Sequence, residues 1–583
     1  MKVQLQSATE DLLEGRLDEA ETRFELARSF GQRASNVAWH PAAAFADVLP
    51  WIGDDVDAVQ TIASSVDDIS AGGLALVDAA RSAGWNGESI DELGADSRIP
   101  LEAFKAAAPF LYRAADEMEE AYKVLEPLDS SSLIGPIGDA AKTVREATSE
   151  SADQIGSAAA LADLIPGFLG DEQPRQYFLA FQNLDAPRGT GGFLGLYGIL
   201  QADDGALRLT EFSHTEDLAP VEGFQQSGDV AARYARFGGL SSFEASNYSP
   251  DFPTTARLIL DMWSAVGRGE LDGVIATDPV WMSQALEELG PVETPAWPEA
   301  VTSTNVSRVF HHDTFLLPPQ ESNSAQEAIG SALWDAFMER IESLRALSGA
   351  VAEGVRSRHL QAYSAVRREQ ILLESLGASG KIPSSSNPLF VVWQDASSNR
   401  AGFFARKTTH HRVTLSAEGT ATVATTVSLQ NDAPSGPPSI LLGSGTTGDP
   451  VGYFAAYVNV YLPTKATEIR SSVTPPAVEL QLIEREFGWP VAMELLGARP
   501  GRTASVEVSY RVPDAVRELE SGAEYRIEYL PQPALRPDRV SVEIVLPEGA
   551  AVTGAAPGAE TDGHVVRWNL TASEPRSFWV RWA

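Results

Sequence analysis

The stretch QNLDAPRGTGGFLGLYG, from Gln182 to Gly198, follows an apolar run, Tyr177–Phe181, that predicts a strand. It joins a carboxylate, Asp185, and a guanidinium, Arg188, to a set of closely spaced glycines. These glycines are Gly189, Gly191, Gly192, Gly195 and Gly198. Glycine permits positive φ and lets a ligand or a neighbouring strand come close. The stretch therefore predicts a tight turn in which charged groups lie beside exposed backbone.

Two interpretations of this turn stay open. Successive backbone N–H groups can form an anion-binding concavity, and Arg188 beside them offers a planar group that fits phosphate oxygens. Alternatively, the glycines simply allow two strands to pack closely. The stretch is not a dinucleotide fingerprint, because Leu194 stands where the third glycine belongs. It is not a P-loop either, because no Gly-Lys-Ser/Thr follows.

The composition is that of an ordinary globular protein. The chain has 583 residues, which predicts roughly three or four domains at about 150 residues each. Its formal net charge of −36 argues against nucleic acid and anionic membrane surfaces as direct partners. The absence of cysteine excludes disulfides and thiol chemistry, and it suits an oxidising exterior. No apolar run reaches the roughly 18 residues that a membrane-spanning helix needs.

Residues 1–170 predict helices. Apolar residues recur at steps of four and three, which places an apolar stripe on each helix and suits bundle packing. The first such series is Leu13, Leu17, Ala20, Phe24 and Ala27. We expect a helical stalk, or alternatively a bundle that binds a partner.

The remaining chain predicts an α/β core followed by β structure. Strand and helix patterns alternate over residues 171–385, which favours an α/β fold. After that the period becomes two, as in Val506 and Val508, which predicts antiparallel sheets with one buried face. We expect a β-sandwich over 386–515. Residues 516–583 are either a second β module or the completion of the first.

The central stretch resembles a family of Gram-positive membrane-anchored proteins known as domain of unknown function 4012. The motif of that family typically reads Gln-Asn-Asn-x-Glu-x-Arg-Pro-Thr-Gly-Gly-Phe. The matching residues here are Gln182, Asn183, Arg188, Thr190, Gly191, Gly192 and Phe193. Further similar segments, in order, begin at Asn247, Asp272, Thr304, Arg358 and Asn399. The run of matches covers about residues 180–410, and its order makes the resemblance fairly specific.

This chain departs from the motif of the family at three positions. Leu184 replaces the second asparagine, Ala186 the glutamate, and Gly189 the proline. If the glutamate of the family serves as a metal ligand or base, Asp185 is the neighbouring residue that could substitute for it. The family usually carries an N-terminal transmembrane helix. The resemblance therefore implies an extracytoplasmic, cell-surface protein that is membrane-anchored through a helix missing from this sequence.

A looser similarity is to the LytR–CpsA–Psr glycopolymer transferases, which move lipid-pyrophosphate-linked polymers onto the cell wall. That similarity implies that several arginines hold the pyrophosphate and that acidic residues hold Mg²⁺. The candidate phosphate-binding residues are Arg188, Gly189, Gly191, Gly192, Arg358, Arg367, Arg368, Asn399 and Arg400. Each charge-assisted hydrogen bond contributes about 1.5–3 kcal/mol, so several converging arginines would hold a pyrophosphate tightly. Any one of them could instead form a surface ion pair worth about 0–1 kcal/mol.

Three aspartates are candidate Mg²⁺ ligands, since hard cations prefer carboxylate oxygens. They are Asp185, Asp251 and Asp278. Asp251 and Asp278 each precede a predicted helix and could equally be N-caps. Asp185 and Arg188 are the candidate catalytic residues.

Two functions follow as alternatives. The first is an extracytoplasmic transferase or hydrolase that acts on lipid-pyrophosphate-linked envelope polysaccharide by glycosyl-phosphate transfer, with Mg²⁺. The second is a non-catalytic envelope scaffold or glycan-binding protein. Convergence of Arg188, Arg358, Arg367 and Arg400 around one cleft would favour the enzyme, and their dispersal would favour the scaffold. In either case the expected partner is an envelope glycan or a prenyl-pyrophosphate-linked substrate, and not nucleic acid.

Overall fold

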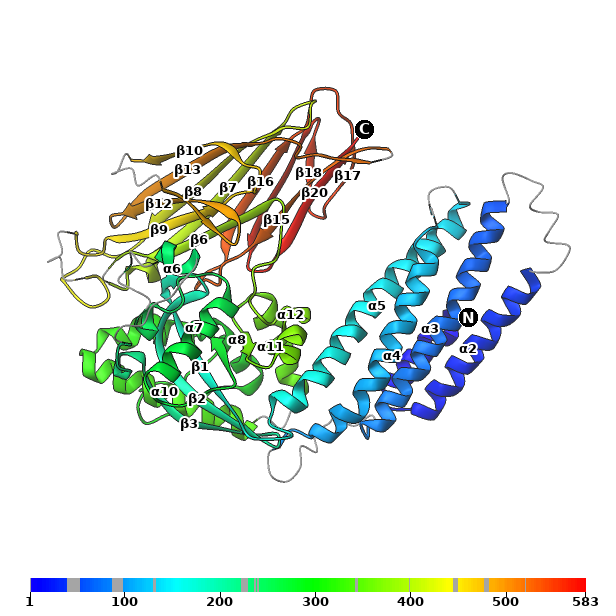
Figure 1. The fold of residues 1–583 in the computed structure, drawn as a ribbon, viewed down its shortest axis with the longest axis horizontal. Helices are drawn as coiled ribbons and strands as arrows, with labels where there is room; N and C mark the ends of the chain where they lie inside the picture. The colour runs from blue at the N-terminus through cyan, green and yellow to red at the C-terminus, as the bar shows by residue number, and fades with distance from the viewer. Residues whose placement is uncertain are drawn as a thin grey trace.

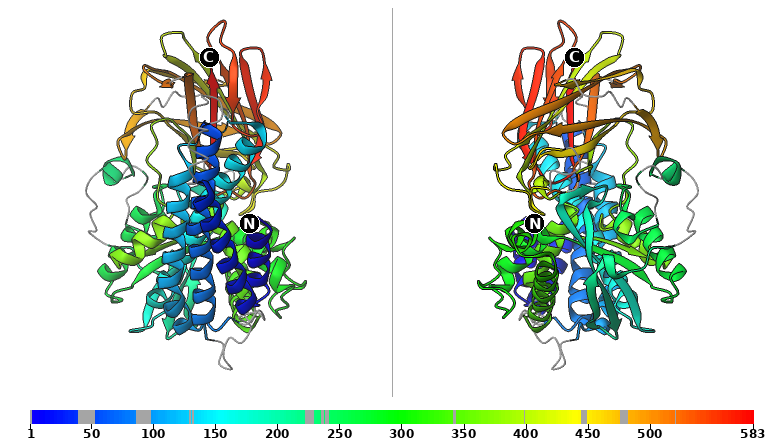
Figure 2. Two further views of the ribbon diagram at one scale, coloured as in Figure 1. Left: turned by 90° about the vertical axis from the view of Figure 1, so that its right-hand side faces the viewer. Right: turned by 90° about the vertical axis from the view of Figure 1, so that its left-hand side faces the viewer.

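The protein forms a helical bundle, an α/β core and a β-sandwich, in that order along the chain (Figure 1). The computed structural model describes residues 2–38, 53–85, 98–128, 130, 133–221, 229–234, 237, 241–340, 344–397, 399–443, 449–475, 482–519 and 521–583. The bundle lies beside the α/β core, and the sandwich lies above that core in the front and side views (Figures 1 and 2). The predicted order of a helical part followed by sheet-containing parts is confirmed.

The bundle consists of long helices packed side by side (Figure 1). They are α1 (Lys2–Leu13), α2 (Leu17–Ala38), α3 (Gly53–Ser82), α4 (Leu101–Leu125) and α5 (Gly135–Phe168). The apolar stripe of α2 is buried, with Phe24 in one cluster with Val77 of α3. A Cβ on Gly73 would lie 2.3 Å from the Phe24 ring, so this glycine lets the helices approach. In the described part of the chain no helix is both long and apolar enough to span a membrane.

The α/β core is built on a mixed sheet with the strand order β3-β2-β1-β4-β5. Its strands are β1 (Arg175–Arg188), β2 (Gly191–Asp203), β3 (Ala206–His214), β4 (Gly273–Thr277) and β5 (Gln361–Ser364). Its helices are α6 (Asp229–Tyr234), α7 (Phe252–Ala265), α8 (Pro279–Leu289), α9 (Val306–Arg308), α10 (Pro319–Arg340), α11 (Leu344–Arg356) and α12 (Arg367–Ser375). β1 pairs with β4 in parallel, and the other neighbours are antiparallel.

Helices cover this sheet on both faces because successive residues of β1 point to opposite sides. Phe178 and Ala180 belong to the cluster that includes residues of α7. Leu179 and Phe181 belong to a different cluster, which includes residues of α10. Almost every residue of β1 is therefore buried, up to its half-buried last residue, Arg188.

The β-sandwich consists of two facing sheets. One has the order β10-β13-β8-β7-β16-β19-β18 and the other the order β11-β12-β9-β6-β15-β20-β17. Their strands are β6 (Pro388–Asp395), β7 (Ala405–Leu415), β8 (Ala421–Asn431), β9 (Phe454–Tyr461), β10 (Thr467–Thr474), β11 (Leu482–Glu486), β12 (Trp489–Ala498), β13 (Arg502–Val512), β14 (Arg517–Leu519), β15 (Gly522–Leu530), β16 (Asp538–Val545), β17 (Val552–Ala555), β18 (Glu560–Asp562), β19 (Val565–Ala572) and β20 (Arg576–Trp582).

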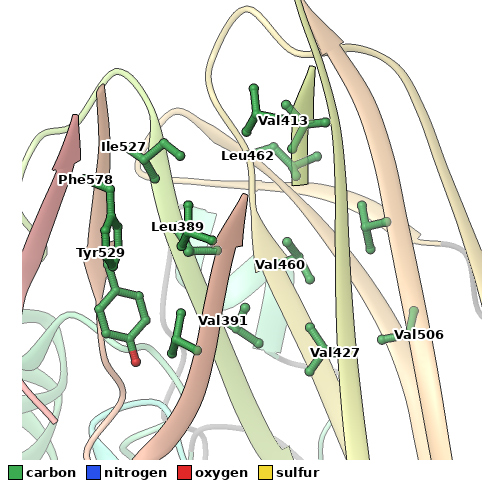
Figure 3. Close-up of a cluster of buried hydrophobic side chains, with 14 of the residues drawn as sticks. Leu389, Val391, Val413, Val427, Val460, Leu462, Val506, Ile527, Tyr529 and Phe578 are labelled. Atoms are coloured by element: carbon green, nitrogen blue, oxygen red, sulfur yellow. The ribbon is translucent and has the colours of Figure 1, made fainter. Parts of the chain in front are cut away.

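The inward-facing residues of the two sheets form a shared core, part of which is drawn in Figure 3. This core reaches from Leu389 in β6 to Trp582 in β20. β15 lies beside β6, and β16 lies beside β7, each in parallel pairing. The strands after residue 516 thus lie within the same sheets as those before it.

A buried carboxylate, Glu486 of β11, joins the sandwich to the α/β core. It is 0% exposed. It accepts hydrogen bonds from the hydroxyls of Tyr234 (2.8 Å), Ser249 (2.9 Å) and Tyr461. Since Tyr234 and Ser249 belong to the α/β core and Tyr461 to the sandwich, this contact fixes the two parts against each other.

Candidate functional site

The glycine-rich stretch forms a hairpin, because β1 ends at Arg188 and β2 begins at Gly191 in antiparallel register. A Cβ on Gly189 would lie 2.2 Å from the carbonyl oxygen of Tyr248. A Cβ on Gly192 would lie 2.1 Å from the carbonyl oxygen of Asn183. These glycines are therefore required for close packing of backbone, which is the structural alternative for the turn.

Buried amide side chains hold the hairpin in place. The Asn247 side-chain amide donates to Gln182 Oε1 (3.1 Å), to Thr190 Oγ1 (3.2 Å) and to the carbonyl of Gly192 (2.7 Å). The Thr190 hydroxyl donates to Gln182 Oε1 (2.7 Å). Gln361 donates to the Thr190 carbonyl (2.9 Å). Buried hydrogen-bond networks of this kind fix one geometry, so the motif residues Gln182, Thr190 and Asn247 position the turn.

A bulge in β1 shapes the site. Asn183 pairs with Phe193 and Pro187 pairs with Gly192, so the residues between Asn183 and Pro187 have no register partner on β2. Bulges of this type redirect side chains and are frequent beside functional sites. His311 stabilises the bulge, because the Leu184 N–H donates a hydrogen bond to His311 Nε2 (3.0 Å). Burial lowers the pKa of His311, so its imidazole is a neutral structural acceptor.

A cavity of about 640 Å³ lies beside this bulge. We call it the site cavity. It is lined by Ala186, Arg188, Phe193, Asp395, Ser397, Asn399, Arg400, Pro438, Ser439, Ile440 and Gly443. The lining brings together residues of the hairpin, of the end of β6 and of the loop before β9. The α/β core and the sandwich thus contribute to it jointly.

Arg188 lies half-buried in the wall of the site cavity. Its Nη1 donates to the backbone carbonyls of Pro187 and Asp395, each at 3.1 Å. Its guanidinium lies 5.0 Å from the ring centroid of Tyr248 and 5.8 Å from that of Phe193. Its Nε is buried and has no hydrogen-bond partner in the described part of the protein. Backbone carbonyls and aromatic rings hold the guanidinium in place, and its Nε–H donor is left without an acceptor.

Arg400 approaches the same cavity from the sandwich side. Its guanidinium lies 5.2 Å from the ring centroid of Phe193 and 4.8 Å from that of Phe315. Its Nη1 is 3.6 Å from Oδ1 of Asp185, whose side chain is 0% exposed. Neither carboxylate oxygen of Asp185 has a hydrogen-bond donor among the described residues. Asp185 is therefore the counter-ion of Arg400 and does not line the cavity.

Asp395 is the carboxyl group that does line the cavity. Burial raises its pKa to about 6, against the opposing charges of Arg188 and Arg400. Its Oδ1 accepts hydrogen bonds from the backbone N–H of Ser397 (3.1 Å) and from the hydroxyl of that residue. A carboxyl with this pKa exchanges a proton near neutrality, which suits a proton donor or acceptor.

Asn399 lies in the cavity wall, but its side-chain amide forms hydrogen bonds with the backbone. Its Nδ2 donates to the Tyr453 carbonyl (2.9 Å), and its Oδ1 accepts from the Ala401 N–H (2.9 Å). It therefore positions Arg400, its neighbour in the chain, and offers little remaining capacity for a ligand.

The other predicted arginines do not join this group. Arg358 lines a different cavity, between α7 and the sandwich. Arg367 and Arg368 are exposed at the start of α12, where Arg368 donates to Asp163 of α5 at 2.7 and 2.8 Å. Among the predicted phosphate-binding arginines, Arg188 and Arg400 converge and the rest are dispersed.

The predicted metal ligands have other partners. Asp251 caps α7 through the Thr254 N–H (3.2 Å), and Asp278 caps α8 through the Val280 N–H (2.9 Å). Asp278 also lies 2.6 Å from Nδ1 of His359. In the part of the chain that the structure describes, no group of three or more His, Asp or Glu side chains is placed to hold a metal ion. The three aspartates thus do not share a site, and Mg²⁺ stays a prediction.

Two lining residues, Asp395 and Phe193, and one support, His311, carry roles that the sequence alone did not assign. Asp395 ends an apolar strand with no distinctive motif. Its proximity to Arg188 depends on β6 packing against β1, and no local signal could have shown it. Phe193 belongs to the motif of the family, but its proximity to both guanidiniums depends on the fold.

Comparisons with known proteins yield a family match over part of the chain. No curated protein matches the chain. Among solved structures, a candidate nutrient binding protein of Legionella pneumophila aligns with 33% of this chain and 70% of its own, at 7% identity. Its TM-score of 0.20 is too low to carry any argument. Residues 172–315 match the family described as protein of unknown function (DUF4012), a range that contains β1 to β4, the hairpin and Phe315 beside Arg400. Over these residues the chain is similar to the DUF4012 family.

Proposed function

We propose that this protein is an extracytoplasmic cell-envelope protein whose site cavity binds an anionic group of an envelope polysaccharide, or of its prenyl-pyrophosphate-linked precursor. The observation that carries the proposal is the convergence of Arg188 and Arg400 on the ring of Phe193 in the wall of the cavity. An aromatic ring beside guanidiniums offers a surface for a sugar ring and donors for an acidic substituent.

Binding is favoured over catalysis by the distribution of charge. Transfer of a phosphoryl group requires many donors around oxygens that gain charge. Here Arg358, Arg367 and Arg368 lie away from Arg188. Asp251 and Asp278 cap helices, and Asp185 is the counter-ion of Arg400. A pyrophosphate in the site cavity would contact Arg188 and Arg400. Two guanidiniums are enough to bind an anion, whereas phosphoryl transfer needs more donors. In this interpretation the bundle spaces the binding site from the membrane surface.

A direct test is titration calorimetry with inorganic pyrophosphate and with a phosphorylated envelope polysaccharide. Arg400→Ala should weaken binding of both about 10- to 100-fold, the equivalent of one or two charge-assisted hydrogen bonds. Arg188→Ala should do the same. The control is Arg412→Ala, which removes an exposed arginine of β7 that does not line the site cavity.

The proposal fails if the wild-type protein shows no saturable binding of either probe. It fails equally if affinity is unchanged in both arginine variants while each remains folded by circular dichroism.

A second candidate, a glycosyl-phosphate transferase with a LytR–CpsA–Psr-like core, is favoured by Asp395. A carboxyl with a pKa of about 6 beside two guanidiniums could accept a proton from an attacking hydroxyl. Under this candidate Asp395→Asn should abolish release of glycan from a prenyl-pyrophosphate donor and leave binding of the donor intact. Absence of any turnover by the wild-type protein, with and without Mg²⁺, would leave the binding function.

A further inference from the structure

A second, larger cavity of about 1210 Å³ lies between the α/β core and the sandwich. We call it the junction cavity. Its core side includes Arg257 of α7, Arg358, and Lys381 in the segment before β6. Its sandwich side includes Phe487 and Trp489 of the β11–β12 hairpin. The walls therefore differ in chemistry, cationic on one side and aromatic on the other.

The charges that line the junction cavity do not cancel. Its carboxylates are Asp251, Glu374 and Glu574, and its cations are Arg257, Arg356, Arg358 and Lys381. Lys381 pairs with Glu374 (2.6 Å). Arg356 pairs with Glu353, which lies outside the lining, at 2.6 Å and with Glu574 at 3.4 Å. Asp251 accepts the N–H groups of Thr254 and Ile382 as a cap. Four cations against three carboxylates leave the lining itself with one positive charge, in a chain whose formal net charge is −36.

Arg358 is the centre of that charge. The residue is 5% exposed. Its Nη2 donates to the carbonyls of Pro250 (3.1 Å) and Gly380 (2.9 Å), while Nε and Nη1 have no hydrogen-bond partner among the described residues. Burial lowers the pKa of Arg358 to about 10, with Asp251 opposing the shift. A buried guanidinium in this state favours an anion close by.

The opposite wall offers an exposed aromatic side chain. Phe487 is 45% exposed and has a φ of 51° at the tip of the β11–β12 hairpin. A bulky side chain rarely adopts positive φ, and Arg358 shares this conformation with a φ of 63°. Strained backbone of this kind clusters at ligand-binding sites, where the surrounding structure holds it in place. Trp489, Leu530 and Ile382 continue the apolar wall.

We propose that the junction cavity binds an anionic amphiphile, whose phosphate or carboxylate head compensates the charge of Arg358 and whose apolar chain lies against Phe487 and Trp489. The volume exceeds the roughly 300–1,000 Å³ of common small-molecule pockets, which leaves room for a chain as well as a head group. This site is separate from the site cavity and does not depend on the function proposed for it.

Dodecyl phosphate below its critical micelle concentration is the probe, measured by titration calorimetry against the full chain. Wild type should bind it saturably, with a negative heat-capacity change from apolar burial. Arg358→Asn removes the cation and suits positive φ, so it should weaken binding about tenfold or more. Phe487→Asn likewise suits positive φ and should weaken binding about fivefold by removing apolar contact. Dodecanoate in place of dodecyl phosphate separates a carboxylate head from a phosphate head.

The matched control is Ile483→Asn, on the same hairpin and 49% exposed, outside the lining. It should leave affinity unchanged. If Arg358→Asn does not fold, the comparison of Phe487→Asn with Ile483→Asn decides the question. Equal binding of neutral dodecyl maltoside, equal binding of inorganic phosphate alone, or no effect of the Arg358 and Phe487 variants would each overturn the proposal. Arg400→Ala should not change this binding, which separates it from a failure of the site cavity.

Discussion

At the scale of single residues, the site cavity is set by how each charge is compensated. Arg400 is held near Asp185 at 3.6 Å, while Arg188 is held by backbone carbonyls and by the ring of Tyr248. Asp395 then remains as the carboxyl that faces the cavity, with a pKa raised to about 6 by burial. The ionisation of one group therefore decides whether the cavity is neutral or positive.

This leads to a prediction for stability as a function of pH. The folded-state pKa of Asp395 lies above the unfolded value, so its contribution is fully present below pH ~4 and is lost as the pH rises through 6. Asp395→Asn should remove this dependence and raise the free energy of unfolding at pH 7.5 by about 1–2 kcal/mol, after discounting for partial exposure. Urea denaturation of wild type and Asp395→Asn at pH 5 and pH 7.5 measures this pH dependence of the free energy of unfolding. The exposed Asp562→Asn is the control, and equal pH slopes for wild type and Asp395→Asn would contradict the expectation.

At the scale of elements, the hairpin of β1 and β2 owes its geometry to glycines that admit no side chain. Gly189→Ala would place a Cβ 2.2 Å from the Tyr248 carbonyl oxygen, where backbone cannot yield easily. We expect it to lower the free energy of unfolding by about 3 kcal/mol or more, at the upper end for single substitutions. Gly349→Ala in α11, where a Cβ meets nothing within 4 Å, should raise it by about 0.5–1 kcal/mol.

Chemical denaturation of the two variants makes the comparison within the α/β core. Equal stability of Gly189→Ala and wild type would mean that the hairpin can move away from residues 248–249, and the described packing would then not be required.

At the scale of the whole molecule, Glu486 couples the sandwich to the α/β core. Removing the charge from a fully buried carboxylate that pairs with Arg233 (3.5 Å) and accepts three hydroxyl donors should cost about 3–5 kcal/mol. Glu486→Gln should therefore separate one calorimetric transition of core and sandwich into two. Glu543→Gln, which disturbs ion pairs with Arg412 and Arg567 on an outer sheet face, is the control and should cost about 1 kcal/mol or less. A single unchanged transition in Glu486→Gln would show that other contacts suffice.

The sequence by itself determined the features that depend on neighbours along the chain. The step of three and four around Phe24 gave helices, the period of two around Val506 gave sheet, and the glycines after Arg188 gave a hairpin. The motif from Gln182 to Phe193 also showed the resemblance to DUF4012, whose model matches residues 172–315. These signals are local because the α and β periods and positive φ act within a few residues.

Tertiary structure alone decided which charges meet. Arg400 lies near Arg188 because β6 and the short helix after it, which begins next to Arg400, both pack against β1. Arg358, which the sequence also offered as a phosphate ligand, lines another cavity. Asp395 acquired its raised pKa from burial between two domains. These contacts form because surfaces far apart in the chain are buried against each other. The hydrophobic effect that drives this burial is non-directional, so a local sequence pattern does not show which surfaces will meet.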